Sequence, residues 1–535
     1  MSRTRTKGML RGIVILTLLA LLAACSNNAG GGNNGGNNGG ANSGNTGGNK
    51  ATNTANTGKS DQNGGEKPDA GASDQLKEAK LTFYYPSNPA GGDQPLVQDE
   101  INTYLKEKIN ATVELKPLSF DEYDTKLNAM MAAGESFDLA WSSRYWLLPY
   151  QSNVDKGAFL ELTDEMIAKY APEARANIPD KFWPDMKAVD GKVYAFPIYQ
   201  VAAKTKSLVI QKRFIDKYNL DVSTIKTYKD IEPFLKTLKE NEKGIVPFGM
   251  AQNSWGIYVD RDIVGGDGLA VSYAKNDPTF TGISELEQLD RRKEYYATMR
   301  SWFKAGYING DAPILKNIND LKAKGTVAVG IEFTSKPGGE VDEMNVNGGN
   351  EVVYVPISDS YFTGISGAMH VISKTSKNPE RTLMLINLLN TDKYLYNLIC
   401  NGIEGKHYAK KDDMYIEPIK DSGYAPNVDW VFGNQFNAYL KPGQTPDVWA
   451  RTVALNDNAV VSESYGFSLN QESIKSEIAN VQAAKEEFQL ALETGAVDPE
   501  KQLPKFIDKL KASGQEKIDA EADKQWKAFL AAKGK

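Results

Sequence analysis

The sequence predicts an α/β fold that ends in an all-helical region. Between residues 80 and 141, β-rich runs alternate with segments of helical periodicity in the order β-α-β-α-β. This order favours a parallel sheet with helices on both faces. From Gln471 onward the pattern is almost wholly helical. In parallel sheets, ligands bind in the crevice beyond the carboxyl ends of the strands, so that edge is where a site is expected.

The first half of the pattern supplies three strands and two helices. Strands are expected at Lys80–Tyr85, Ala111–Leu115 and Phe137–Trp141, and a helix at Gln94–Ile109, where apolar residues recur at helical spacing. Ser119 and Glu122 have the spacing of a capping box, which predicts the start of the second helix. That helix should stop near Gly134.

The alternation resumes after residue 200 and then gives way to helices. Further strands are expected at Lys206–Gln211, Val246–Met250, Thr326–Ile331, Glu351–Pro356 and Ala368–Ser373. Helices are expected at Tyr228–Asn241, Gln288–Ala305, Pro379–Leu389, Gln471–Glu493, Leu503–Leu510 and Gln515–Ala532. No linker divides this part of the chain, so its lobes should be interleaved rather than arranged in series.

The composition excludes several classes of protein. The 535 residues include 62 Lys and Arg against 68 Asp and Glu, and this acidic balance disfavours nucleic acid as a partner. With two His and two Cys, the chain lacks the ligands of zinc ribbons or His-based metal clusters and the cysteines of a disulfide scaffold. Asp342–Glu351 carries oxygen ligands without the spacing of a calcium loop. We expect no metal and no cofactor.

The first 24 residues are predicted to be a signal peptide. Four cations precede the apolar stretch Gly12–Ala23, which is shorter than the roughly 20 residues that a membrane span needs. Leu22-Ala23-Ala24-Cys25 resembles the lipobox of bacterial lipoproteins, which implies cleavage before Cys25 and acylation of its thiol and new amino terminus. Cleavage would change the net charge from −6 to −10.

The segment after Cys25 is predicted to be a disordered tether. Ser26–Gln75 contains 14 Gly and 12 Asn and nothing apolar larger than Ala, so it cannot bury enough surface to offset its ordering entropy. Residues 25–78 together would form the lipidated anchor and its spacer, holding the protein on the outer face of the cell membrane. Once Cys25 is acylated, Cys400 is the remaining thiol, and we expect it to be a small buried hydrophobe.

Several motifs in the folded part resemble one family. Asp190-Gly191-Lys192-Val193-Tyr194-Ala195-Phe196-Pro197, the strand that follows it, Arg213–Tyr218 and Ser376–Arg381 resemble segments of the extracellular solute-binding proteins of ABC importers. Gly402–Tyr408 and Tyr465–Trp526 are similar to a lipoprotein-type subfamily with a helical C-terminal region. Each motif is weak alone, but their order and spacing together are specific.

The resemblance implies a two-lobed fold of the periplasmic-binding-protein type, whose interleaved lobes close on a solute without chemistry. The lobes are expected at 79–200 plus 368–430 and at 201–367 plus 431–535. The implied partners are a small solute, the permease subunits of an ABC importer and the lipid bilayer, and the protein is expected to be a monomer and no enzyme. The subfamily resembles importers of oligosaccharides, including uronate-bearing ones, and peptides remain an alternative class of solute.

Two other function classes remain open at the level of the sequence. A secreted glycoside hydrolase or lyase would use two facing carboxylates, and 68 acidic residues leave such a pair possible. A Ser-His-Asp site is disfavoured because no Gly-x-Ser-x-Gly motif is present and His370 lies in a strand-like run. A lipid-anchored adhesin is the second alternative, but adhesin stalks rarely show this α/β alternation.

Aromatic and polar residues at strand ends and crossings predict a carbohydrate site. Sugars present C–H faces that stack on aromatic rings, and aromatics such as Trp146 follow expected strand ends. The predicted ligand-binding residues are Trp141, Ser142, Arg144, Tyr145, Tyr199, Gln200, Trp255, Asp262, Trp430, Asn434 and Gln435. Arg144 is the one strong cation of its group, and it is interpreted either as a bidentate partner of a uronate or as part of an ordinary ion pair.

Overall fold

The computed structural model describes residues 76–87, 90–144, 146–252, 261–263, 270–272, 283–362 and 364–534. Of 261–263 and 270–272 it describes the backbone alone. The predicted signal peptide, Cys25 and almost all of the tether lie outside the described residues. Within the described residues, no helix combines the length and apolar character needed to span a membrane.

The first lobe is built on a five-stranded mixed sheet of order β2-β1-β3-β13-β4. Its strands are β1 (Ala79–Pro86), β2 (Ala111–Leu118), β3 (Leu139–Ser142), β4 (Ala195–Pro197) and β13 (Met369–Ile372). The pairs β1–β2 and β1–β3 are parallel, as the sequence predicts, and they bring the carboxyl ends of three strands to one edge. β13 runs antiparallel to both β3 and β4, so the sheet is mixed rather than wholly parallel.

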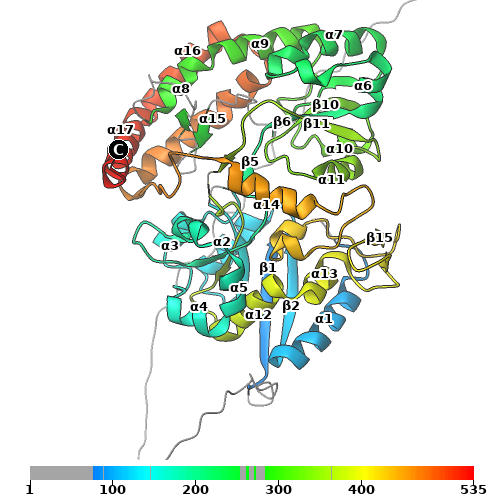
Figure 1. Cartoon of the computed structure of the whole chain (residues 1–535). Coiled ribbons are helices and arrows are strands. Elements are labelled where there is room, and N and C mark those ends of the chain that lie inside the picture. Colours follow the sequence, from blue (N-terminus) through cyan, green and yellow to red (C-terminus); the bar gives the residue numbers. More distant parts are fainter. Residues whose placement is uncertain are drawn as a thin grey trace, which may run out of the picture. The chain divides into compact units, whose positions relative to one another are not determined.

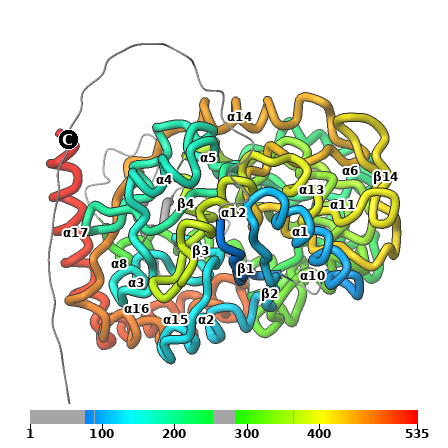
Figure 2. The backbone as a smooth tube through the Cα atoms, turned by 90° about the horizontal axis from the view of Figure 1, so that it is seen from below, coloured from blue at the N-terminus to red at the C-terminus, as the bar shows by residue number. Residues whose placement is uncertain are grey.

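Helices of the first lobe pack on this sheet and on one another. They are α1 (Gln94–Ile109), α2 (Tyr123–Ala132), α3 (Tyr150–Asp155), α4 (Asp164–Tyr170), α5 (Pro172–Asn177), α12 (Pro379–Thr391), α13 (Lys393–Asn401) and α14 (Val448–Asn458). α1 has the predicted bounds because Val97, Ile101 and Leu105 recur every fourth residue and are all buried. Figure 2 shows α4, α5 and α12 side by side. A hairpin of β14 (Tyr408–Lys410) and β15 (Ile416–Pro418) follows α13.

The second lobe is built on a four-stranded sheet of order β11-β6-β10-β7. Its strands are β6 (Ser207–Gln211), β7 (Val246–Phe248), β10 (Val327–Glu332) and β11 (Val352–Pro356), with α6 (Lys212–Tyr218), α7 (Glu232–Asn241), α10 (Asn319–Ala323) and α11 (Gly339–Val346). A separate two-stranded sheet pairs β8 (Arg261–Ile263) with β9 (Ala270–Ser272). β6 is buried at every position, which fits its place between two partners.

The C-terminal region is a helical layer on the second lobe. It comprises α15 (Lys475–Glu493), α16 (Pro499–Ala512) and α17 (Gln515–Ala532), which pack against α8 (Glu285–Arg291) and α9 (Lys293–Ala305) (Figure 1). Trp526 of α17 and Trp302 of α9 lie in the same hydrophobic core as Phe248 of β7. The predicted all-helical end of the chain is therefore confirmed.

Three short strands connect the lobes. β5 (Ala203–Lys204), β12 (Tyr361–Phe362) and β16 (Val460–Val461) form their own sheet of order β16-β12-β5, and each lies where the chain passes from one lobe core to the other. The chain therefore crosses three times.

The crossings correct the predicted lobe boundaries. Ala203, Phe362 and Ile365 were expected in the second lobe but belong to the core of the first. The largest correction is at the third crossing. The lobes were expected to divide at residue 430, but Val431, Phe432 and Ala459 all belong to the core of the first lobe. Residues 431–459 therefore belong to that lobe, and the crossing lies at β16. The boundary was placed too early because a two-residue strand carries no periodic signal.

The second helix also begins differently from the prediction. Ser119 Oγ donates to the Glu122 carboxylate, at 2.9 Å, instead of capping a backbone N–H, and α2 begins at Tyr123. Its end agrees with the prediction, because Gly134 adopts a φ of +69°, the left-handed conformation that follows a helix C-terminus.

Candidate functional site

Four aromatic side chains gather at the carboxyl edge of the first sheet. Phe120 follows β2, Trp141 lies in β3, Trp146 follows β3, and Trp430 lies in the 3-10 helix η5 (Asp429–Val431). The first three meet because β1, β2 and β3 are parallel and end at one edge. We call Phe120, Trp146 and Trp430 the aromatic patch.

The rings of the aromatic patch form a surface rather than a column. The ring centroids are 5.7 Å apart for Phe120–Trp146, 6.0 Å for Trp146–Trp430 and 6.4 Å for Phe120–Trp430, with interplanar angles of 18°, 33° and 28°. A linear stack would make one of the three distances about twice the others, and these are nearly equal. The patch therefore presents three neighbouring, roughly parallel rings.

Trp141 supports the patch from beneath. It contacts Trp146 and Trp430 edge-on, at 81° and 79°, and its own ring is 0% exposed. Trp146 is 50% exposed, and Phe120 and Trp430 are half-buried. Trp141 was predicted to contact a ligand, but in this structure the accessible rings are those packed above it.

The first crossing segment adjoins the patch through Gln200. The side-chain amide N–H of Gln200 donates to the Trp430 carbonyl oxygen at 3.5 Å. The backbone carbonyl of Gln200 accepts a hydrogen bond from the Asn456 side chain. The predicted residues Trp430 and Gln200 are thus brought together from distant parts of the sequence.

Four other predicted residues are buried in the scaffold. Ser142 Oγ donates to the Leu148 carbonyl at 2.7 Å, and the backbone N–H of Gln435 donates to the Tyr199 carbonyl at 2.9 Å. Asn434 caps the following turn through its side chain. Ser142, Tyr199, Asn434 and Gln435 are each less than a tenth exposed, so a ligand does not reach their side chains in this structure. Tyr145, Trp255 and the side chain of Asp262 lie outside the described part of the chain.

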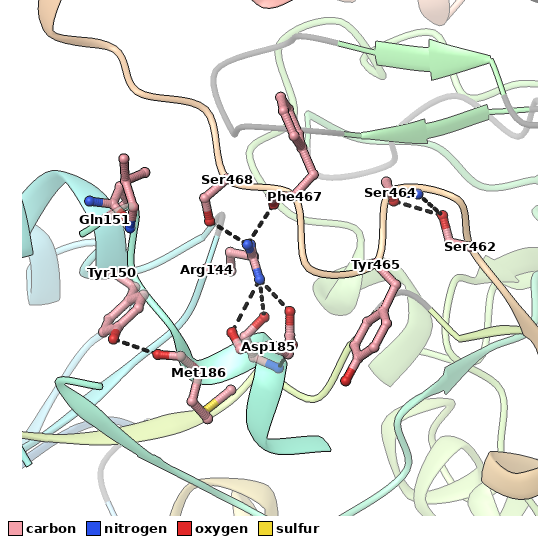
Figure 3. A network of polar contacts seen from close by, with 12 residues as sticks. Arg144, Tyr150, Gln151, Asp185, Met186, Ser462, Ser464, Tyr465, Phe467 and Ser468 are labelled. Carbon is pink, nitrogen blue, oxygen red and sulfur yellow. Dashed lines mark hydrogen bonds and ion pairs between the residues drawn. The ribbon is translucent and has the colours of Figure 1, made fainter. Parts of the chain in front are cut away.

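Arg144 forms an ion pair and hydrogen bonds in a buried polar network (Figure 3). Its guanidinium forms an ion pair with the Asp185 carboxylate, and the two side chains are 8% and 0% exposed. It also donates to the Phe467 carbonyl at 2.6 Å and to Ser468 Oγ, both beyond the third crossing. Of the two interpretations of Arg144, the ion pair is the one that the structure forms, although it is buried rather than at the surface.

A charged group lies where the two lobes meet, beside the patch. Lys441, from the first lobe, lies 3.5 Å from the carboxylate of Asp429 and 3.9 Å from that of Asp342 on α11 of the second lobe. Asp429 precedes Trp430 of the aromatic patch. The nearby carboxylates, Asp429 above all, raise the pKa of Lys441, which therefore stays charged.

The second lobe contributes the loop after β10 to the same place. Glu332 ends β10 and Lys336 lies in the loop that follows. The electrostatic neighbours of Lys336 include Asp429 and Lys441 of the first lobe. Sequence reasoning missed this loop, as it missed Phe120 and left Trp146 out of the predicted set. Phe120 follows a strand end just as Trp146 does, so an aromatic search at every strand end would have found it.

The two histidines and Cys400 are buried parts of the scaffold. His370 is fully buried, its Nε2 bonds to the Val431 carbonyl at 2.9 Å, and burial lowers its pKa to about 4, which confirms the predicted structural role. His407 accepts from the Ile403 N–H at 2.8 Å, and Cys400 is buried as expected. Within the described ranges, no three residues among His, Cys, Asp and Glu gather as metal ligands would.

Relatives of known structure and name share this architecture. The chain is 28% identical over 455 residues, 82% of its length and 89% of the relative's, to a carbohydrate ABC transporter substrate-binding protein of Streptococcus pneumoniae. It superposes on the N-glycan transport solute binding protein NgtS of the same species with a TM-score of 0.74 and 25% identity, covering 85% of this chain and all of that one. The complex of NgtS with Man5GlcNAc matches with a TM-score of 0.72 and 26% identity over 85% and 99% of the two chains.

Two families match separate parts of the chain. Residues 463–531, which contain α15, α16 and all but the last residue of α17, match a domain of unknown function, DUF3502. The relatives are substrate-binding proteins of ABC transporters rather than enzymes, so the glycosidase alternative gains no support. Residues 101–399, more than half of the chain, match the bacterial extracellular solute-binding proteins, and the chain therefore belongs to that family.

Proposed function

We propose that this protein captures an oligosaccharide between its two lobes and delivers it to the permease of an ABC importer. The aromatic patch carries the proposal. Three roughly parallel rings, one of them half exposed, offer an apolar surface on which the C–H faces of successive sugar units can stack. Gln200 and the charged residues beside Trp430 supply hydrogen-bonding groups for hydroxyls at its rim.

The relatives support the carbohydrate assignment. One is named a carbohydrate transporter component, and another was solved with an oligomannose ligand, Man5GlcNAc. A surface of several rings suits a ligand of more than one sugar unit better than a monosaccharide, because a single sugar would cover only part of it.

The mature protein is proposed to be anchored to the outer face of the cell membrane through Cys25. The support is the lipobox-like Leu22–Cys25, the preceding apolar stretch and the Gly- and Asn-rich segment that separates Cys25 from β1. Acyl chains contribute about 0.8 kcal/mol per buried CH₂, so more than one chain holds the protein at the membrane. The tether would then leave the lobes free to reach the permease.

A thermal-shift screen tests the function. The chain from residue 25 on, carrying Cys25→Ser to prevent acylation, is heated with Man5GlcNAc, other neutral oligosaccharides, uronate oligosaccharides and peptides. A ligand that binds only the folded state raises the apparent stability by RT ln(1 + [L]/Kd), so an oligosaccharide should raise Tm. A shift with peptides alone would contradict the proposal, and cleavage of an oligosaccharide with turnover would restore the enzyme alternative.

A further inference from the structure

The loop after β10 is held in place by the first crossing strand. The backbone N–H and Oγ of Ser335 both donate to the Thr205 carbonyl, each at 3.0 Å, and Ser335 Oγ lies 2.7 Å from Ser207 Oγ. Ser335 is buried. The next residue, Lys336, is therefore fixed relative to the junction of the lobes rather than carried on a loose surface loop.

The same loop touches the first lobe on its other side. The Gln444 side chain lies within hydrogen-bond distance, 3.4 Å, of the Gly338 carbonyl. A Cβ at Gly338 would lie 2.5 Å from the Val448 side chain, and its φ of +75° also favours glycine. This close approach places Lys336 between Thr205 at the crossing and the 444–448 segment of the first lobe.

Lys336 is a half-buried cation without a direct partner among the described residues. Its electrostatic neighbours are Glu332 and Asp342 of the second lobe and Asp429 and Lys441 of the first. Asp429 and Asp342 both lie within 4.0 Å of Lys441, whereas no ion pair or hydrogen bond joins the Lys336 ammonium to another described side chain. Burial accordingly lowers the pKa of Lys336.

We propose that Lys336 is a ligand-binding residue that donates hydrogen bonds to hydroxyl oxygens of a neutral sugar unit lying on Trp430. The inference rests on the proposed function. Lys336 has Asp429 among its electrostatic neighbours, and Asp429 precedes Trp430 in η5. The Lys336 ammonium group has three N–H donors, and burying them without hydrogen-bond acceptors costs free energy. The hydroxyl oxygens of a bound sugar would supply the acceptors that the described residues do not.

The charges of the neighbourhood select neutral over acidic sugars. Three carboxylates lie near these two ammonium groups: those of Asp342 and Asp429 are neighbours of both Lys336 and Lys441, and that of Glu332 is a neighbour of Lys336. A uronate would add a fourth negative charge to this group, and Arg144, the cation expected to bind it, is paired with Asp185. Lys336 therefore determines specificity through hydroxyl recognition rather than through charge pairing with an acid.

The test is the affinity of Lys336→Met for Man5GlcNAc, measured by isothermal titration calorimetry. Loss of the hydrogen bonds from the Lys336 ammonium to the ligand hydroxyls is expected to weaken the affinity for Man5GlcNAc by about 10- to 100-fold. Lys324→Met is the matched control, because Lys324 is an exposed lysine of the same lobe at the end of α10, and its affinity should stay that of the parent. Uronate oligosaccharides should bind more weakly than neutral ones to the parent protein.

The outcomes separate this inference from the function on which it rests. If the parent binds no oligosaccharide of the panel, the proposed function fails and the role of Lys336 fails with it. If the parent binds Man5GlcNAc and Lys336→Met binds it within twofold, the role of Lys336 alone is wrong. Tighter binding of uronates than of neutral sugars would overturn the selectivity.

A measurement on the parent protein covers the case in which Lys336→Met does not fold. Lysines are acetylated with and without saturating Man5GlcNAc, and modification of each lysine is read by mass spectrometry. Lys336 should be protected several-fold by the ligand, and Lys324 should not. Equal modification of Lys336 in both samples would overturn the proposal.

Discussion

Trp146 exposes half of its side chain at the rim of the aromatic patch, so its removal should affect the ligand more than the fold. Trp146→Ala is expected to weaken Man5GlcNAc binding by roughly 5- to 150-fold, which corresponds to about 1–3 kcal/mol by analogy with bases stacked on aromatic rings. Titration calorimetry measures the loss, and thermal unfolding checks that Tm is nearly unchanged. Tyr394→Ala is the control, because Tyr394 on α13 is 46% exposed and packs on Tyr104 instead. Equal losses in both variants would argue against the patch.

Arg144 illustrates the opposite case, a charged side chain whose partner is buried with it. Arg144→Met leaves Asp185 buried without its cation, and the free energy of unfolding should fall by about 3–5 kcal/mol. Arg175→Met is the matched control, because its pair with Asp180 is 38% and 88% exposed and should contribute about 0–1 kcal/mol. Denaturant unfolding of the two variants compares them. A loss below 1 kcal/mol for Arg144→Met would mean that water reaches Asp185.

Residue types at strand ends were predictable from the sequence, but burial and partners were not. The position of Trp430 within the polar-aromatic stretch Asn427–Phe436 indicated a site residue, and the fold brings it to Trp146. Whether the ring of Trp141 or that of Trp146 is exposed depends on which strands pair with β3. The local sequence does not show that pairing. Arg144 finds Asp185 in a 3-10 helix 41 residues away, a contact that no local pattern encodes.

At the scale of elements, the helical C-terminal layer is joined to the second lobe by a buried charged cluster. Glu285 of α8 lies 3.3 Å from Arg292 and 3.9 Å from Lys485 of α15, and its backbone N–H donates to Asp519 of α17. Glu493 and Asp519 add two further buried carboxylates. Three acids thus face two cations, so one acid is left without a cation and burial favours its protonated form.

This cluster predicts that stability falls as the pH rises from about 4.5 to about 8. Burial, with the neighbouring carboxylates, raises the pKa of Glu285 from its ordinary 4.5 to about 8. Because the folded state holds this proton more tightly than the unfolded chain, its contribution is complete below pH 4.5 and is lost as the pH rises to about 8. Denaturant unfolding should show Glu285→Gln removing a slope of up to about 1.4 kcal/mol per pH unit. The control is Glu287→Gln, an exposed position of the same helix, which should keep the slope of the parent.

Element length decided which parts of the fold the sequence could predict. α1 and α17 were predicted with the bounds that they have, because several turns of helix repeat the apolar spacing. β5, β12 and β16 are two residues long, and they are strands only because β12 pairs with β5, roughly 150 residues earlier, and with β16, roughly 100 residues later. Two residues are too few to show a periodic pattern, so the sequence could not predict this pairing. The third lobe boundary was misplaced for that reason.

At the scale of the whole molecule, the lobes are joined by side chains as well as by the three crossing strands. Arg144 of the first lobe reaches Phe467 and Ser468 at the entrance to the C-terminal region. Lys441 reaches Asp342 of the second lobe. One contact leads into the helical layer and the other lies beside the patch, so we expect a change in the angle between the lobes to alter these contacts. A ligand that contacts both lobes shifts that equilibrium toward the closed arrangement.

Asp342→Asn is expected to weaken closure without disturbing either lobe. Lys441 keeps Asp429 as a partner at 3.5 Å, so the first lobe stays intact, while the charge attraction to α11 is lost. Asp342 is half exposed, and the pair therefore contributes about 0–1 kcal/mol, or up to about fivefold in affinity. Small-angle scattering should show the radius of gyration of the parent falling on addition of saturating Man5GlcNAc, and Asp342→Asn should need more ligand for the same change. Asp320→Asn, on α10 of the same lobe, is the control for charge alone, and its response should match that of the parent. An unchanged radius of gyration in the parent at saturation would show that this protein binds its solute without moving its lobes.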